Sequence, residues 1–136
     1  MMPVDLRNEQ RAVPLDTRRL RRQAESLLAA VGRPDSVLSV LVTDDRRIAP
    51  LHERWMGEPG PTDVMSFPME EAGILGDIVI SAETAARRRP KDPAAEVLRY
   101  LVHGLLHLTG HDHRGKAERL RMDRRARRLQ TKAHAA

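Results

Sequence analysis

Four histidines lie within eleven residues of this sequence, in the stretch HGLLHLTGHDH at 103–113. His103 and His107 are four residues apart, which on a helix is about 40° of rotation and ~6 Å of rise, so both imidazoles can converge on one ion. His113 can join them only if the chain turns back, and Gly110 stands where a helix end favours a left-handed residue. The spacing therefore predicts a metal site made by His103, His107 and His113.

Three neutral imidazoles leave the fourth position of a tetrahedral ion open to water, as in a catalytic zinc site. The HxxxHxxGxxH spacing is that of metzincin proteases, in which a glutamate after the first histidine deprotonates the bound water. Gly104 occupies that position here. We therefore expect one zinc ion per chain, and either the chemistry differs from proteolysis or the base comes from elsewhere.

Two further residues of the same stretch are candidates for a catalytic role. His111 either lines the mouth of the site, where it can handle protons, or is exposed. Asp112 either orients a ligand histidine or caps the following turn, and we favour the first. The remaining histidines, His52 and His134, are expected at the surface and in the C-terminal tail.

The composition limits the classes of protein. The 136 residues suit a single domain spanning 1–136. The chain contains no cysteine, which excludes disulfides and cysteine zinc sites. No stretch approaches the roughly 18 apolar residues that cross a bilayer, and the first residues lack the apolar core of a signal peptide, so we expect a cytoplasmic protein with no membrane partner. The net charge of +5 and the pI near 10.6 favour an acidic partner such as nucleic acid.

The apolar runs and the turn residues between them predict a mixed α/β domain of the α+β type, in which a sheet of about four strands packs with about five helices. Strands are expected at 3–7 on an edge, at 36–43 in the centre with both faces covered, and as neighbours at 62–68 and 75–81. Helices are expected at 15–31, 44–56, 82–89, 93–108 and 116–132. The helix at 93–108 is apolar on most faces and is expected to be buried.

The C-terminal helix is strongly basic. Nine cations between 114 and 132 stand against two acidic residues, which favours contact with an RNA backbone over a merely solvated face. The cations are Arg114, Lys116, Arg119, Arg121, Arg124, Arg125, Arg127, Arg128 and Lys132. Aromatic residues are only 2 % of the chain, so base reading by stacking is not expected.

Four motifs, taken in order, resemble those of the YbeY family, bacterial rRNA maturation factors presumed to be single-strand-specific endoribonucleases. They are LHERW, PGPTDVMSFPM, LGDIVIS and HGLLHLTGHDH, and the matching region runs from about 36 to 113. The histidine motif is specific for the family because glycine replaces glutamate within metzincin-like spacing. Glu96 also falls where the family often carries a glutamate, whereas the N-terminal helix and the basic tail match weakly.

The resemblance implies that His103, His107 and His113 hold zinc. It also implies cleavage of single-stranded RNA in small-subunit rRNA 3′ end processing and ribosome quality control, with the small ribosomal subunit and its assembly factors as partners. One departure concerns phosphate binding. Many members carry an arginine where this chain has Met56, and Arg54, two positions away, is the candidate substitute.

Two other functions remain open at this point. The chain can be a metal-dependent hydrolase of another substrate, such as a peptide or a small ester. It can also be a non-enzymatic ribosome assembly factor that zinc stabilises, a reading favoured by the missing arginine. In the nuclease reading, zinc polarises a phosphoryl oxygen and lowers the pKa of bound water towards ~7, which makes a dedicated glutamate less necessary.

Overall fold

The computed structural model describes residues 4–69, 71–110 and 115–136, and within them it has four strands and five helices. The strands are β1 (Val4–Asn8), β2 (Val37–Thr43), β3 (Val64–Pro68) and β4 (Ile74–Ser81). The helices are α1 (Thr17–Ala30), α2 (Asp45–Met56), α3 (Ala82–Arg88), α4 (Pro93–Leu108) and α5 (Lys116–His134). The predicted mixed α/β class and the approximate bounds of each element are confirmed.

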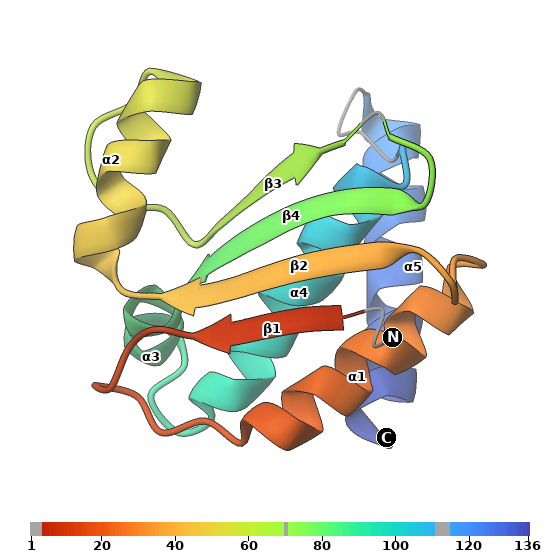
Figure 1. The fold of residues 1–136 in the computed structure, drawn as a ribbon, viewed down its shortest axis with the longest axis horizontal. Coiled ribbons are helices and arrows are strands. Elements are labelled where there is room, and N and C mark those ends of the chain that lie inside the picture. The colour runs from red at the N-terminus through yellow and green to blue at the C-terminus, as the bar shows by residue number, and fades with distance from the viewer. Residues whose placement is uncertain (1–3, 70, 111–114) are drawn as a thin grey trace.

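The strands form one mixed sheet in the order β1-β2-β4-β3 (Figure 1). β1, β2 and β4 are parallel, whereas β3 runs antiparallel to β4 and pairs Val64 with Ile80 and Phe67 with Asp77. The predictions that the first strand lies at an edge and that the two later strands are neighbours are confirmed. β3 forms the other edge of the sheet, and this position decides where the site lies.

One face of the sheet carries the main core. Side chains from alternate positions of β2 and β4 pack there against α1, α4 and α5. In Figure 1, α4 and α5 pass behind the sheet and α1 lies below β1. The strand residues are Leu38, Val40, Val42, Ile78 and Ile80, all at most 1 % exposed. The prediction that the helix at 93–108 is buried is confirmed, because residues on nearly every side of α4 are covered.

The opposite face is covered only at one end, where Ile48 of α2 packs on Met65 and Val79. Ser39 and Leu41 of β2 are half-buried, so the expectation that this strand is covered on both faces is wrong along part of its length. A short apolar run reads as fully buried from sequence. α2 is the helix on this second face of the sheet, and it covers only one end of β2.

Local signals explain where the site-bearing helices begin and end. Asp44 caps α2 by accepting from the Arg47 amide, and the helix continues through Pro50. α2 ends at Gly57, whose positive φ of 72° suits glycine. Asp92 caps α4 in the same way by accepting from the amide of Ala95, and Pro93 takes the first helical position, where its missing N–H costs nothing.

Candidate metal and RNA site

A cleft of about 550 Å³ lies between α2, β3 and α4. Its walls are the last turn of α2, residues 62–67 of the edge strand and its approach, and His103, Gly104 and His107 of α4. Consecutive residues of β3 point to opposite faces of the sheet, yet the four residues from Val64 to Phe67 all line the cleft. The cleft therefore passes along the outer edge of the sheet, where α2 on one face and α4 on the other both reach it.

His103 and His107 lie one turn apart on α4 and both face the cleft. Their ring centroids are 6.5 Å apart and the ring planes cross at 83°. Two imidazoles that bind one ion through nitrogens about 2 Å from it have closer ring centroids than this, so the two side chains would have to rotate toward each other to share an ion. Both histidines thus line one cleft, and their role as metal ligands remains a prediction.

The rest of the predicted ligand set lies outside the described residues. His113, the expected third ligand, falls there, and so do His111 and Asp112. Within residues 4–69, 71–110 and 115–136, no group of three or more histidine, cysteine, aspartate or glutamate side chains is placed to hold a metal ion. Imidazole nitrogens suit zinc or a similar borderline ion, and a three-ligand site here would need a ligand from outside these residues.

The structure explains why glycine stands at position 104. A Cβ built on Gly104 would lie 3.0–3.2 Å from three side-chain carbons of Ile78 on β4. α4 therefore approaches the sheet at this residue more closely than a larger side chain allows. A protease-type glutamate at 104 would require Ile78 to shift by a few tenths of an ångström, so packing disfavours the base of the metzincins at this position.

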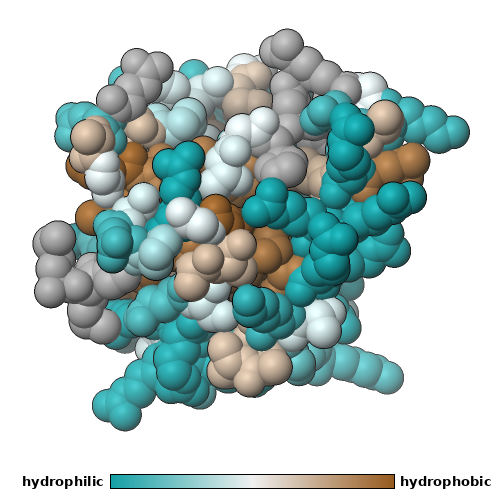
Figure 2. Space-filling model, turned by 90° about the vertical axis from the view of Figure 1, so that its right-hand side faces the viewer, coloured by the Kyte–Doolittle hydropathy of each residue, from teal (hydrophilic) through white to brown (hydrophobic). Residues whose placement is uncertain are grey.

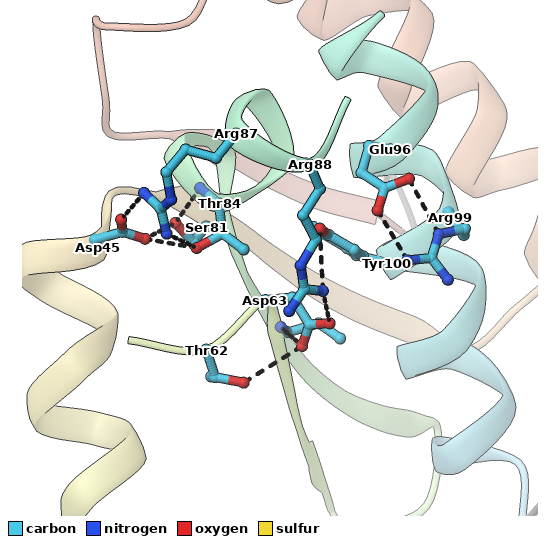
Figure 3. A network of polar contacts seen from close by, with 11 residues as sticks. Asp45, Thr62, Asp63, Ser81, Thr84, Arg87, Arg88, Glu96, Arg99 and Tyr100 are labelled. Carbon is cyan, nitrogen blue, oxygen red and sulfur yellow. Dashed lines mark hydrogen bonds and ion pairs between the residues drawn. The ribbon is translucent and has the colours of Figure 1, made fainter. Parts of the chain in front are cut away.

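Asp63 joins the beginning of β3 to α3 and α4. Its carboxylate accepts from the amide of Val64 and from Arg88, each at 2.7 Å (Figure 3). The Arg88 guanidinium also lies 3.5 Å from the hydroxyl of Tyr100. The hydrogen bond to Asp63 raises the pKa of Arg88. Asp63 thus fixes the backbone where the strand begins, and the charge of its carboxylate is balanced by Arg88 where it meets the cleft.

Glu96 lies two turns before His103 on α4 and is buried. Arg99 donates to its carboxylate at 3.1 and 2.8 Å, and these bonds hold the pKa of Glu96 below its ordinary value (Figure 3). Burial raises the pKa of the neighbouring Tyr100 to about 12. Glu96 is thus an ion-paired carboxylate outside the cleft lining, which suits a structural role better than that of a base.

Asp45 anchors the beginning of α2 to α3. It accepts from Ser81 at 2.6 Å and Thr84 at 2.7 Å, and it pairs with Arg87 (Figure 3). Burial raises the pKa of Asp45, but the hydrogen bonds from Ser81, Arg87 and Thr84 together lower it below the ordinary value. This anchor holds α2 in the place where its last turn forms a wall of the cleft.

The expectation that His52 lies at the surface is wrong. Its side chain is only 13 % exposed and lines the cleft. Nδ1 lies 2.9 Å from the carbonyl oxygen of Gly60, and Nε2 lies 3.6 Å from the Glu58 carboxylate. His52 therefore holds the loop 57–61 against α2. A lone histidine before a Gly/Pro-rich loop gives no sequence signal for such a contact.

Met56 and Arg54 take different places at the end of α2. Met56 is 64 % exposed and lines the cleft. Arg54, two residues earlier, is rotated by about 200° on the helix and is not among the residues that line the cleft. Its guanidinium carbon lies 5.5 Å from the centroid of the Trp55 ring, at the rim. A phosphate contact by Arg54 remains a prediction.

Two of the three aromatic residues meet at this cleft, which the low aromatic content did not suggest. Trp55 and Phe67 both line it, with ring centroids 5.9 Å apart and planes at 73°. They come from different elements, and only the tertiary fold brings them together.

α5 presents its cations outward. Its apolar residues Met122, Leu129 and Ala133 are buried against α4 and α1, whereas most of its cations are exposed. The exposed cations are Lys116, Arg119, Arg121, Arg124, Arg127, Arg128 and Lys132. Figure 2, which views this side of the molecule, shows many hydrophilic side chains with hydrophobic residues visible between them. Across the described part of the chain, no helix combines the length and the apolar character that a bilayer crossing requires.

The fold is similar to that in the solution structure of TM1509 from Thermotoga maritima. The TM-score is 0.66 at 24 % sequence identity, with 96 % of this chain and 88 % of the other covered. This likeness shows a shared fold.

Sequence relatives extend the comparison. The chain is 49 % identical over 115 residues to the Endoribonuclease YbeY of Anaeromyxobacter sp. (strain Fw109-5), covering 79 % of this chain but 60 % of that protein. It is 42 % identical over 140 residues to the Endoribonuclease YbeY of Geobacter sulfurreducens, covering 94 % and 93 %. The chain thus spans about three fifths of the Anaeromyxobacter relative and nearly all of the Geobacter one. Because the profile of the family described as Endoribonuclease YbeY also matches residues 5–134, this chain belongs to the YbeY family.

Proposed function

We propose that this chain is a zinc-dependent endoribonuclease that cuts single-stranded RNA in the cytoplasm. Its role would be small-subunit rRNA 3′ end processing and ribosome quality control, with the small ribosomal subunit and its assembly factors as partners. The observation that carries the proposal is the pair His103 and His107 opening into one cleft of a chain whose relatives are named Endoribonuclease YbeY.

The metal would be one zinc ion per chain, held by His103, His107 and His113. The two described ligands fit this group because they are nitrogen donors on one helix face, one half-buried and one exposed to the cleft. When bound, such an ion polarises a phosphoryl oxygen and lowers the pKa of its water. Gly104 offers no proton acceptor, so His111 is the proposed proton carrier and Asp112 the residue that orients a ligand histidine.

Other residues of the chain would bind and place the RNA. The cations of α5 and Arg54 would contact backbone phosphates, which are bound without regard to sequence. Asp63, tied to Arg88, would keep the edge strand in position beneath the bound strand. A cleft that follows a sheet edge is open along its length, as a single strand requires.

One observation favours a second candidate function, that of a zinc-stabilised assembly factor that binds without cutting. Met56 is exposed in the cleft wall at the position where a phosphate-holding arginine would serve catalysis. A hydrolase of peptides or small esters is the third alternative. The same experiment separates all three.

The test uses the purified wild-type chain, His107→Ala, and His134→Ala as a control histidine that lies exposed on α5. Zinc content is measured by mass spectrometry of the metal, and cleavage is measured on single-stranded RNA, duplex RNA and a peptide. We expect one zinc per chain and selective single-strand cleavage for wild type and His134→Ala, and loss of both for His107→Ala. Zinc binding without RNA cleavage would favour the assembly factor, and peptide cleavage alone the third alternative.

A further inference from the structure

Trp55 is the only tryptophan of the chain, and it is not used to build the core. Its side chain is 59 % exposed on the last turn of α2, although tryptophans are on average highly covered. It lines the same cleft as His103 and His107. A large, flat, apolar ring left open beside a candidate metal site points to a ligand that has a flat face of its own.

The Trp55 ring is held in place on several sides. Phe67 of β3 meets it edge to face at 5.9 Å, and the Arg54 guanidinium lies 5.5 Å from its centroid. Gly57 ends the helix immediately beyond it, and His52 fixes the following loop through the carbonyl oxygen of Gly60. Such a ring loses little freedom when a ligand covers it, so its contact contributes more to affinity.

We propose that Trp55 is a stacking platform for one nucleobase of the single-stranded RNA that enters the cleft. The base lies on the exposed part of the indole, and Arg54 at the rim contacts the adjoining phosphate. Met56, which is exposed beside Trp55 and lines the cleft, extends the apolar wall. This inference rests on the proposed function, and it adds a residue that binds the base rather than the scissile phosphate.

The charges of the cleft favour a nucleic acid over a peptide as the occupant. Asp63 is the only acidic residue among those that line the cleft within the described chain, and Arg88 neutralises it. The Arg54 guanidinium beside the ring adds a cation to the rim, and the chain as a whole carries +5. Base–aromatic stacking tolerates any base, which suits an enzyme that acts on single strands without strict sequence preference.

Because Trp55 is unique, its intrinsic fluorescence reports on the platform alone. The zinc-loaded chain is titrated with a short oligouridylate and with a matched oligomer of equal phosphate number whose bases are removed. Each titration is completed before cleavage product is detectable on a gel. We expect the oligouridylate to change the Trp55 emission and the abasic oligomer to bind at least several-fold more weakly with little change.

Variants then test whether stacking contributes to affinity. Trp55→Ala should weaken binding of the oligouridylate by about five- to 150-fold, measured by anisotropy of a labelled RNA. It should leave binding of the abasic oligomer nearly unchanged. Trp55→Phe should restore most of the affinity, since it keeps an aromatic face. Met69→Ala removes a side chain that is 43 % exposed but does not line the cleft, and it should bind like wild type.

The outcomes separate this proposal from the nuclease itself. If wild type and Trp55→Ala bind RNA equally well and both cleave it, the stacking role of Trp55 is wrong and the proposed nuclease activity is supported. Base-dependent emission changes in a chain that does not cut RNA would support the platform while the nuclease fails. An emission change with an unstructured peptide but not with RNA would overturn it. Circular dichroism of each variant confirms that the fold is kept.

Discussion

At the level of single residues, Gly76 shows how closely the site-bearing strands approach one another. It has a φ of 150°, and a Cβ there would overlap the carbonyl oxygen of Phe67 and lie 2.9 Å from a methyl carbon of Leu108. The backbone oxygen cannot move without disturbing the pairing of β3 with β4. The glycine of the LGDIVIS motif is therefore required by packing as well as by backbone conformation.

Gly76→Ala should lower the free energy of unfolding by about 3–5 kcal/mol, because backbone strain and overlap act together. Gly32→Ala is the matched control. Its φ of 78° is also positive, but nothing lies within 4 Å of the built Cβ, so the expected loss is about 1–2 kcal/mol. Urea denaturation measures both, and equal losses would show that the overlap at Gly76 relaxes without cost.

The ion pair of Glu96 predicts a defined dependence on pH. Its pKa is below the ordinary value of 4.5 in the folded chain. The stability from its charge is therefore complete above that value and is lost as the pH falls through the lower, folded pKa. Glu96→Gln should cost about 1 kcal/mol at pH 7, and the difference from wild type should shrink below pH 4.5.

Denaturation curves of wild type and Glu96→Gln at a series of pH values measure this difference. Glu118→Gln serves as the control, because it removes a pair of the same spacing, with Arg121, from the exposed side of α5. It should change stability little at any pH. A Glu96→Gln deficit that persists undiminished in acid would show that the carboxylate charge is not what stabilises the fold.

Residue roles were predictable from sequence where the signal is local. The bounds of the helix at 93–108 and the placement of His103 and His107 one turn apart on it follow from spacing and neighbours alone. His52 was misplaced and the Trp55–Phe67 contact was not foreseen, because each depends on how α2 packs against the edge of the sheet. Such contacts between distant segments leave no periodic mark in the sequence.

At the level of elements, the contact between α4 and β4 governs the position of the histidines. At the crossing, a Cβ at position 104 would meet Ile78, and His103 and His107 lie on either side of that position on the same helix. If the helix moved outward, both imidazoles would move with it. The absence of a side chain at position 104 is thus a condition of the site geometry.

A double-mutant cycle tests this crossing. Gly104→Val should destabilise the chain by about 1–3 kcal/mol through overpacking, and Ile78→Ala by about 2–5 kcal/mol through the cavity it leaves. In the double variant the valine fills space that the isoleucine vacated, so the combined loss should fall short of the sum by at least ~1 kcal/mol. Strict additivity in thermal and urea unfolding would show that the two residues do not meet.

The elements themselves were well predicted, but their arrangement was only partly so. Strand and helix periods, caps and turn residues placed all nine elements of the described chain near their observed bounds. The order β1-β2-β4-β3 follows from long-range pairing, which the sequence pattern does not encode. The half-covered second face of β2 was missed for the same reason, since coverage depends on where α2 lies.

At the level of the whole molecule, positive charge is concentrated on α5 while the cleft itself carries little. If α5 binds RNA phosphates, the plot of log K for RNA binding against log salt should have a negative slope. On a single strand each phosphate contact contributes about 0.7 to that slope. Arg124→Ala with Arg128→Ala should reduce the slope of log K against log salt by about 1.4, as measured by anisotropy over a salt series.

The control for this experiment is Arg46→Ala with Arg47→Ala. It changes the net charge equally, but at the beginning of α2, where Arg47 is already paired with Glu9. Its slope should stay close to that of wild type. If both double variants reduce the slope alike, only the overall charge matters and α5 is not a specific track for RNA.

The two borders of the sheet differ in a way that bears on self-association. In β1, Asp5 and Arg7 lie on the face opposite the buried Val4 and Leu6. Glu9 follows directly after the strand, and all three charged side chains are exposed. A second copy that extended the sheet at β1 would have to bring its own charges into register with these, which opposes fibril-like stacking. The border formed by β3 has no such charged fringe and is flanked by α2 and α4 instead.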